Sequence, residues 1–477
     1  MAFDPLSPLD AGFLDVEDDV NQMHIGAVLV LEGPAPFRSE LRAMVAGKLP
    51  LVPRYRQTAQ RVPFRFGRPV WVDDPSFDLD YHLRCVALPN PGGVTELREL
   101  VGELMGRGLD PDKPLWEMWM VEGLQDQQWA VLAKVHHSMV DGVGGAELLS
   151  LILDLAQDAV PLPGDNWRPP EKPGQRDLLM RSVRNAVSLP RDAARSAPRA
   201  INSLLSSTGR LQETTRSMLS LARVVKPAAS CSLNGPIGPR RRWASTSVPI
   251  SDIKAVRSSL GGTFNDVVLA TVARGFRGLL EKRGELLDQP IRTLVPVSVR
   301  GRDATGRAVG DGTLANKVSA VFADLPVQVS DPVARLDAIS AQMTSAKRNN
   351  EAGIAQAFTN LGGYLPPALV ALGSRLFTKV PQHNVNTVTT NIPGPQVPLY
   401  AVGRRLLEAY PYVPIAMQVR IGVAMLSYDG RVHFGITGDY EHAPDVEVLA
   451  EGIDIGMEEM VAVAEEPTPF RPHLSPV

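Results

Sequence analysis

The sequence predicts a mixed α/β protein with two similar halves. Strand-like and helix-like segments alternate in the first part of the chain and again after residue 241, whereas the stretch between is rich in proline and arginine. At about 100–200 residues per domain, 477 residues suffice for two or three globular units. We expect an N-terminal domain over 1–165, a basic helical linker over 166–240 and a C-terminal domain over 241–477.

Hydrophobic periodicity defines the elements of the first half. Apolar runs rich in β-branched and aromatic residues predict strands, and apolar residues at helical spacing predict helices. Ser39 is a plausible N-cap for the first helix. The predicted strands cover 25–33, 115–124 and 128–137, the last two as a hairpin, and the predicted helices cover 39–49, 94–108 and a segment beginning at Ala146.

The second half shows the same mixture of patterns. Asp429 and Gly430 separate two apolar runs, and this dipeptide predicts a tight hairpin turn. A long helical pattern follows the first strand of this half. The predicted strands cover 241–250, 291–300, 316–326, 384–395, 417–430 and 431–441, and the predicted helices cover 264–284, 332–348, 353–377 and 445–463.

The connection between the halves is strongly basic. Residues 171–245 contain 14 Lys or Arg and 4 Asp or Glu, a net charge of +10 in a chain whose total is −3. Apolar residues at helical spacing run through the same segment. Two interpretations remain open: a solvated helical linker, or a basic amphipathic surface that meets anionic lipid.

Composition excludes several classes of protein. A net charge of −3 argues against a protein that binds polyanions with its whole surface. Cys85 and Cys231 are the only cysteines, which argues against a secreted disulfide scaffold and a cysteine-ligated metal. We expect no signal peptide and no membrane span, because neither a basic segment followed by an apolar run nor 18 consecutive apolar residues occurs. A cytosolic enzyme or binding protein is the resulting expectation.

The stretch of greatest chemical interest is KVHHSMVDGVGGAEL, residues 134–148. Side chains of successive strand residues point to opposite faces. His136 and His137 therefore cannot both enter one site from a regular strand, and one of them should be structural. The plain alternative is a buried, hydrogen-bonded histidine at a strand end.

Three kinds of chemistry compete for this stretch. A histidine and an aspartate four residues apart could share a metal on a helix, but the other histidines supply no clear third ligand. Nucleophilic catalysis lacks a G-x-S-x-G elbow or a well-placed cysteine. A lone general base needs only orientation, and imidazole, with a pKa of about 6.5, is partly neutral at cytosolic pH. Asp141 could fix the backbone through an ion pair, and Gly142 could permit a tight turn close to substrate.

The motif HHSMVDG, an H-H-x-x-x-D-G signature, resembles that of coenzyme A-dependent acyltransferases and of nonribosomal peptide condensation domains. Further motifs in the same order make the chain similar, more narrowly, to the bacterial wax ester synthase/diacylglycerol acyltransferase family, and especially to actinobacterial triacylglycerol synthases. The isoleucine of NIPGP stands where many relatives have valine. The motifs are PLSPLDAGF (5–13), PLW (114–116), HHSMVDG (136–142), FNDVVLA (264–270), PVSVR (296–300) and NIPGP (391–395).

This resemblance implies a fold and a mechanism. Two coenzyme A-dependent acyltransferase-like α/β domains would form a pseudo-dimer with a tunnel between them. His137 would be the general base and His136 would pack behind it. Asp141 would be structural, paired with an arginine from the N-terminal region, for which Arg56 is the candidate by position. No metal and no cofactor are expected, and long-chain acyl-CoA would be a substrate.

The remaining motifs would be structural or line the tunnel. Simpler interpretations coexist with this one: TFND also fits a capping box between Thr263 and Asp266, NIPGP fits a rigid turn, and PLW fits core packing. The residues that we assign to this group, besides Gly142 and Arg56, are Pro114, Leu115, Trp116, Asn265, Asp266, Arg300, Asn391, Pro393 and Gly394.

The implied activity is acyl transfer from acyl-CoA to diacylglycerol, with wax ester synthesis on long-chain alcohols. Two alternatives are a carrier-protein-dependent acyltransferase of the same superfamily and a lipid-droplet binding protein with a vestigial site. We expect a cytoplasmic protein that associates peripherally with the inner membrane or with lipid droplets, and no nucleic-acid partner. The pattern does not determine acyl chain length, the preferred acceptor or the oligomeric state.

Overall fold

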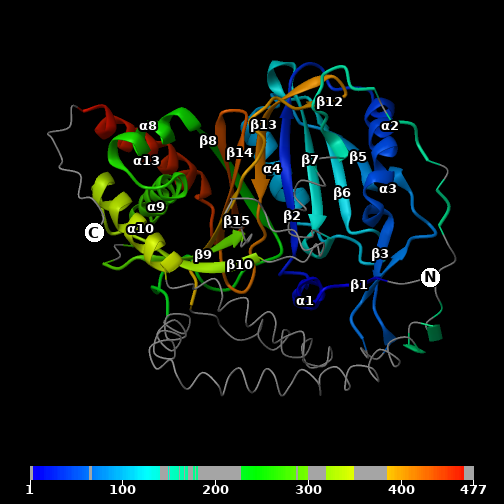
Figure 1. Ribbon diagram of the computed structural model, residues 1–477, viewed down its shortest axis with the longest axis horizontal. Coiled ribbons are helices and arrows are strands. Elements are labelled where there is room, and N and C mark those ends of the chain that lie inside the picture. The colour runs from blue at the N-terminus through cyan, green and yellow to red at the C-terminus, as the bar shows by residue number, and fades with distance from the viewer. Residues whose placement is uncertain are drawn as a thin grey trace, which may run out of the picture.

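A computed structural model shows two α/β halves lying side by side (Figure 1). The blue and cyan N-terminal half and the green, yellow and red C-terminal half each contain a large sheet. The structure describes residues 4–63, 67–139, 149, 151–160, 162–165, 167–169, 174, 176–177, 179–180, 227–285, 288–298, 318–348 and 384–466. The mixed α/β prediction is confirmed.

The sheet of the N-terminal half has six strands in the order β12-β13-β2-β7-β6-β5. Its central strands are antiparallel, and only β5 runs parallel to its neighbour β6. A separate three-stranded sheet, β1-β4-β3, lies beside it. The bounds are β1 Asp4–Pro5, β2 His24–Leu31, β3 Gln57–Gln60, β4 Val70–Asp73, β5 Leu83–Ala87, β6 Trp116–Glu122, β7 Trp129–His136, β12 Tyr400–Ala401 and β13 Arg404–Tyr412.

The sheet of the C-terminal half has the order β10-β9-β11-β14-β15-β8. The predicted hairpin joins β14 to β15, and both Asp429 and Gly430 have positive φ, as a tight hairpin turn requires. The bounds are β8 Arg241–Pro249, β9 Ile291–Ser298, β10 Val318–Leu325, β11 Thr387–Ile392, β14 Ile421–Tyr428 and β15 Arg431–Asp439.

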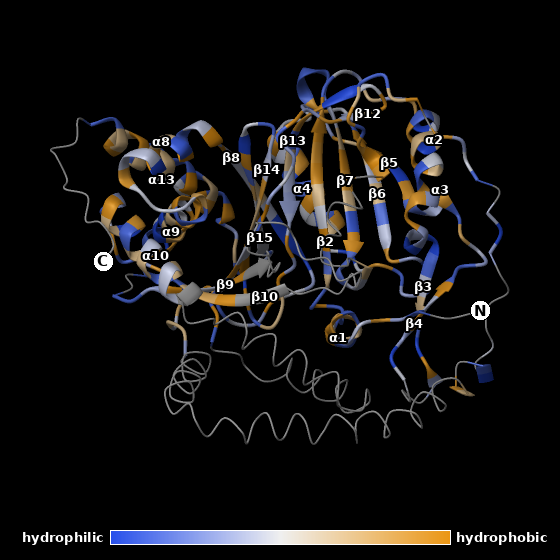
Figure 2. Ribbon diagram, viewed as in Figure 1, coloured by the Kyte–Doolittle hydropathy of each residue, from blue (hydrophilic) through white to orange (hydrophobic). Residues whose placement is uncertain are grey.

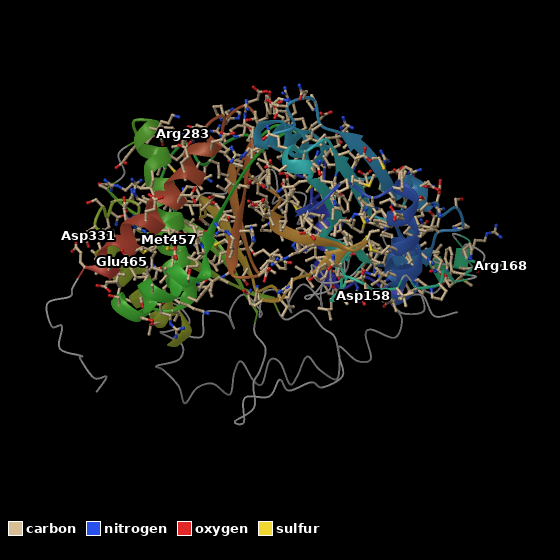
Figure 3. The ribbon with its side chains drawn as sticks, turned by 90° about the horizontal axis from the view of Figure 1, so that it is seen from above. Asp158, Arg168, Arg283, Asp331, Met457 and Glu465 are labelled. Carbon is tan, nitrogen blue, oxygen red and sulfur yellow. The ribbon has the colours of Figure 1, made fainter. Side chains whose placement is uncertain are left out.

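Four helices, α8, α9, α10 and α13, gather at the outer side of the C-terminal sheet (Figure 1). Seen from above, Met457 and Glu465 of α13 lie at the end of the molecule opposite Arg168 (Figure 3). No helix in the described ranges is both long and apolar enough to span a bilayer. The bounds are α1 Pro8–Val16, α2 Arg38–Lys48, α3 Leu79–His82, α4 Val94–Met105, α8 Ile250–Leu260, α9 Phe264–Lys282, α10 Pro332–Arg348 and α13 Val446–Glu465.

Apolar packing holds these layers together. Strands β2 and β7 are apolar along most of their length (Figure 2), because both faces of the N-terminal sheet are covered. One face packs against α2, and the other packs against α4, which also contacts β8 of the second half. The C-terminal sheet and helices α8, α9, α10 and α13 enclose a core of their own.

One helix start differs from the prediction. The N-cap of α2 is Phe37, and the carboxylate of Glu40 accepts a hydrogen bond of 2.8 Å from its backbone amide. Ser39 is therefore the second helical residue, and its assignment as the cap is wrong. A glutamate in the first turn satisfies a free amide as well as a capping hydroxyl would.

Strand β13 connects the two halves. It comes late in the chain, yet it pairs antiparallel with β2, with Tyr412 opposite Gly26. It also packs against β14 and β15 of the C-terminal sheet. A Cβ atom on Gly435 of β15 would overlap the carbonyl oxygen of Pro411, so glycine there permits the close approach of the two sheets.

We expect Gly435→Ala to destabilise the protein by about 1–3 kcal/mol, because a rigid backbone carbonyl occupies the space that the methyl group needs. Thermal and urea unfolding would measure the change. Gly108→Ala is the matched control, since no atom lies within 4 Å of a Cβ atom built there. Equal stability of the two variants would contradict this account of the sheet contact.

Candidate active site

The histidine motif lies where β7 ends. The amide of His136 donates to the carbonyl oxygen of Leu115 at 2.9 Å, and the amide of His137 donates to that of Met23 at 2.8 Å. These acceptors immediately precede β6 and β2, the two neighbours of β7. The backbone of both histidines is therefore held from both sides.

The PLW motif anchors the neighbouring strand. Pro114, Leu115 and Trp116 are all buried. The indole N–H of Trp116 donates to the carbonyl oxygen of Tyr55 at 2.8 Å, and His82 stacks on the indole with ring centroids 4.5 Å apart. The motif is core packing, as the simpler interpretation predicts, and through Leu115 it also fixes the end of β7.

The two imidazoles have different surroundings. His136 is fully buried, and its Nδ1 accepts a hydrogen bond of 3.1 Å from the amide of Ser138. The Nε2 atom lies 3.2 Å from a carboxylate oxygen of Glu17. His137 begins the 3-10 turn η5, His137–Met139, and remains partly accessible.

The ring of His137 stacks on Phe13, with centroids 4.1 Å apart and planes inclined by 23°. Burial lowers the pKa of His137 to about 4; contact with its own backbone raises the pKa, and the adjacent His136 lowers it. The side chain is therefore neutral at physiological pH, which is the protonation state that a general base requires.

The N-terminal motif PLSPLDAGF builds the helix that carries Phe13. Ser7 is the N-cap of α1, and its hydroxyl accepts a hydrogen bond of 3.1 Å from the amide of Asp10. Pro8 occupies the first helical position, where its missing N–H is harmless. The helix packs against η5, so this motif and the histidine motif meet in space.

Two further motifs meet in the C-terminal half. The side-chain Nδ2 of Asn391, near the end of β11, donates to the side-chain Oδ1 of Asn265 on α9 at 3.2 Å. The capping box is confirmed, because the amide of Thr263 donates to Asp266 at 2.8 Å and the amide of Asp266 donates to the Thr263 hydroxyl at 3.3 Å. Asp266 is thus occupied with the helix start, and Asn265 contacts the other motif.

The NIPGP turn lies close to β14. The amide of Gly394 donates to the Ser427 hydroxyl at 3.1 Å, and a Cβ atom on Gly394 would overlap the Ser427 carbonyl oxygen. Pro393 beside it is exposed. The rigid-turn interpretation of this motif agrees with these contacts.

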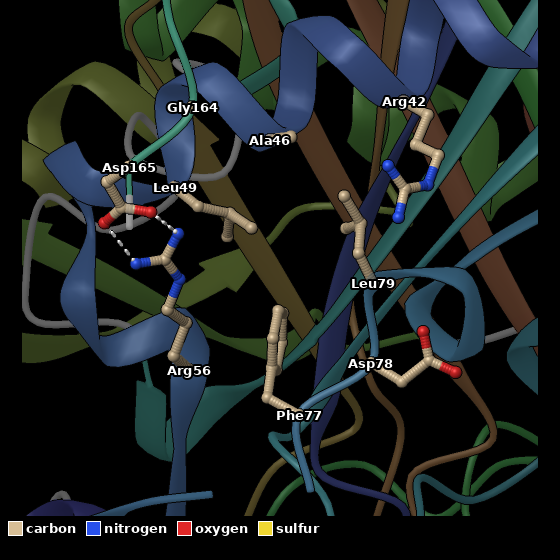
Figure 4. A pocket seen from close by; sticks show the side chains of 9 residues that line it. All are labelled: Arg42, Ala46, Leu49, Arg56, Phe77, Asp78, Leu79, Gly164 and Asp165. Atoms are coloured by element: carbon tan, nitrogen blue, oxygen red, sulfur yellow. Dashed lines mark hydrogen bonds and ion pairs between the residues drawn. The ribbon is translucent and has the colours of Figure 1, made fainter. Parts of the chain in front are cut away.

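Arg56 pairs with an aspartate that the sequence did not suggest. Both of its terminal nitrogens bind Asp165, at 2.7 and 2.8 Å, and the guanidinium lies over the ring of Trp167 (Figure 4 shows the ion pair). The pair lines a pocket of about 280 Å³ together with Phe77 and other residues, and His136–Met139, the described part of the histidine motif, is not among the lining residues. Asp141, Gly142 and Arg300 lie outside the described residues.

Comparisons with known proteins decide the family. The model of the wax ester synthase/diacylglycerol acyltransferase catalytic domain matches residues 6–268, and the model of the C-terminal domain matches residues 314–461. The chain belongs to the wax ester synthase/diacylglycerol acyltransferase family. A probable diacylglycerol O-acyltransferase of Mycobacterium tuberculosis, tgs1, is 37% identical over 470 residues, which cover 96% of each chain. The chain is thus a member of an acyltransferase family.

Solved structures agree with this family. The wax ester synthase/diacylglycerol acyltransferase of Marinobacter aquaeolei VT8 is 27% identical, with a TM-score of 0.66 over 96% of this chain and 99% of that one. The first condensation domain of the calcium-dependent antibiotic synthetase, at 14% identity and a TM-score of 0.57 over 96% of this chain and 97% of that one, shows the same fold. The predicted two-domain acyltransferase-like architecture is confirmed.

Sequence reasoning missed three side chains around the histidines: Phe13, Glu17 and Ser138. Phe13 is the last residue of a motif that we had used only for the resemblance. Ser138 lies inside the histidine motif at one of its variable positions. No local sequence pattern marks Glu17. Its carboxylate lies near His136 only because the folded chain brings the end of α1 to the end of β7.

Several histidines of this protein are buried in the neutral form. Burial lowers the pKa of His82, His137 and His433 to about 4, and that of His24 well below its usual range. The unfolded chain takes up these protons near pH 6.5. Between about pH 6.5 and 4 the unfolded state therefore holds more protons, so stability is full above pH 6.5 and declines as the pH falls toward 4.

His433 offers a direct test of this acid sensitivity. It is fully buried on β15, and neither ring nitrogen has a hydrogen-bond partner among the described residues. We expect His433→Leu to equal or exceed wild type in stability at pH 7.5 and to lose less stability by pH 5, because one proton-binding site of the unfolded chain is removed. Melting temperatures at both pH values measure this, and an unchanged pH dependence would contradict it.

Proposed function

We propose that this chain is an acyl-CoA:diacylglycerol O-acyltransferase that makes triacylglycerol and also acts on long-chain alcohols to make wax esters. The observation that carries the proposal is His137, a neutral imidazole held at the end of β7 in a member of this acyltransferase family. The 37% identity to a probable diacylglycerol O-acyltransferase over nearly the whole chain supports the choice of acceptor.

The proposed step is a direct transfer with His137 as general base. Its imidazole takes the proton of the acceptor hydroxyl while the hydroxyl oxygen bonds to the thioester carbonyl carbon. The tetrahedral oxyanion collapses, the carbon–sulfur bond breaks, and the proton passes from the imidazolium to the coenzyme A thiolate. Ester and free coenzyme A leave, and no acyl-enzyme forms. Because Nδ1 of His137 is buried, we assign the base to Nε2.

The other motif residues take supporting roles in this proposal. The contact between Asn265 and Asn391 joins α9 to the end of β11 and would shape the acyl tunnel between the halves. Asp141 would orient the backbone after the histidines through an arginine. Arg56 already binds Asp165 through both terminal nitrogens, so it would serve Asp141 through its remaining N–H groups; the Nε atom is buried and has no partner among the described residues.

Purified protein given labelled palmitoyl-CoA should form labelled triacylglycerol with diacylglycerol, and labelled wax ester with a long-chain alcohol. His137→Ala should lower turnover by about 10²–10⁴-fold, the usual effect of removing a general base. His136→Ala is the matched control and should cost less, provided that circular dichroism shows a folded protein. Absence of both products with wild type, or equal losses in the two folded variants, would contradict the assignment.

The substrates also imply a lipid surface, because diacylglycerol and long-chain alcohols are insoluble in water. We propose peripheral binding to the inner membrane or to lipid droplets through the basic segment 171–245, whose net charge is +10. Anionic lipid attracts each basic residue near its surface by about 1 kcal/mol, and salt weakens the attraction. Most of this segment lies outside the described residues.

The protein should therefore float with vesicles that contain phosphatidylserine at low salt, and changing Arg176, Arg181 and Arg184 to Gln should weaken the binding. Vesicles of phosphatidylcholine alone are the control for charge. Equal and salt-insensitive binding by wild type and the triple variant would move the membrane contact to another surface and leave the basic segment as a solvated linker.

A further inference from the structure

The carboxylate of Glu17 contacts two groups that adjoin His137: the backbone amide of Met23 and the ring of His136. One oxygen accepts a hydrogen bond of 3.3 Å from the amide of Met23, whose carbonyl oxygen in turn accepts the amide of His137 at 2.8 Å. The other oxygen lies 3.2 Å from Nε2 of His136. Glu17 directly follows α1. From this position its carboxylate contacts both the Met23 backbone, which binds His137, and the ring of His136.

The hydrogen bonds of His136 determine its tautomer. A backbone amide can only donate, so the 3.1 Å contact from the Ser138 amide makes Nδ1 an acceptor. The proton of the neutral ring therefore resides on Nε2, which faces the Glu17 carboxylate. This contact does not meet the criteria of a hydrogen bond, and the attraction is that between a polarised N–H group and a nearby anion.

The backbone on both sides of the His137 side chain is held, because the amides of His137 and Ser138 both donate hydrogen bonds. The ring of His136 bridges from Glu17 to the amide of Ser138, the residue directly after His137. The Ser138 hydroxyl also lies 2.6 Å from Nδ1 of the same ring. Since η5 is only three residues long, the positions of its first and second amides largely determine where the His137 side chain projects.

We propose that Glu17 is a positioning residue for His137: it holds the His136 ring and the Met23 amide so that the turn η5 presents the His137 imidazole to the reacting hydroxyl. The proposal rests on the proposed role of His137 as general base. It assigns a function to the C-cap of α1 and to His136. Phe13 on the same helix also contacts His137, by stacking on its ring.

A competing role for Glu17 is charge balance. Burial lowers the pKa of Lys134 to about 8, and the carboxylates of Glu117 and Glu17 raise it. The ammonium group of Lys134 itself donates to the carbonyl oxygens of Leu104 and Arg107 at the end of α4. If charge balance were the whole role, removing the charge while keeping the shape would cost as much as removing the side chain.

Glu17→Gln and Glu17→Ala separate these roles. Glutamine keeps an acceptor oxygen for one of the two contacts and loses the charge, whereas alanine loses both contacts. We expect kcat for triacylglycerol or wax ester formation to fall by about 10–100-fold in Glu17→Ala and by less in Glu17→Gln, with KM for palmitoyl-CoA little changed. Glu103→Gln is the matched control, because Glu103 is an exposed carboxylate paired with Arg107 on the surface of α4.

A double-substitution cycle tests whether Glu17 acts through His136. The loss caused by Glu17→Ala should be smaller in a His136→Gln background than in wild type, because the two residues share one path to His137. Full additivity, an unchanged kcat in Glu17→Ala, or equal losses of activity and melting temperature in the Gln and Ala variants would each overturn the positioning role. Wild type without transferase activity would instead refute the proposed function on which it rests.

Discussion

The antiparallel pairing of β13 with β2 adds a late segment of the chain to the sheet that carries the histidine motif. Strand β2 also pairs with β7, so β13 lies one strand away from the strand that ends in the histidine motif. The same strand packs on β14 and β15, where Gly435 lets the carbonyl oxygen of Pro411 approach closely. Strand β13, together with the contact between α4 and β8, therefore fixes the position of His137 relative to the C-terminal half.

The signature motifs contact one another in the folded protein. The helix built by PLSPLDAGF stacks Phe13 on His137, and Leu115 of PLW accepts the amide of His136. In the second half, Asn265 and Asn391 join two motifs that lie 126 residues apart in the chain. The general base that we propose must be held in a fixed direction, and these packing contacts would hold His137 in that way.

Local patterns explain which elements were predictable. The hairpin at Asp429 was found because its turn chemistry and flanking alternation are both local, and the capping box at Thr263 spans only three residues. Strand β13 escaped prediction because Pro411 and the charged residues Arg405 and Glu408 interrupt its apolar pattern. Its strand character comes from the partner β2 and from burial against the other sheet, neither of which is local.

Local stretches of the sequence suffice to predict the α/β class, most helices and strands, and the family, because periodicity, turn residues and ordered motifs are all local features. The folded protein shows what the sequence does not: that His136 is the fully buried histidine of the pair, that its Nδ1 accepts a hydrogen bond so that Nε2 carries the proton, and that Arg56 binds Asp165. These depend on distances between residues far apart in the chain. A carboxylate such as Glu17 acquires its role only when the fold brings it to 3.2 Å from an imidazole.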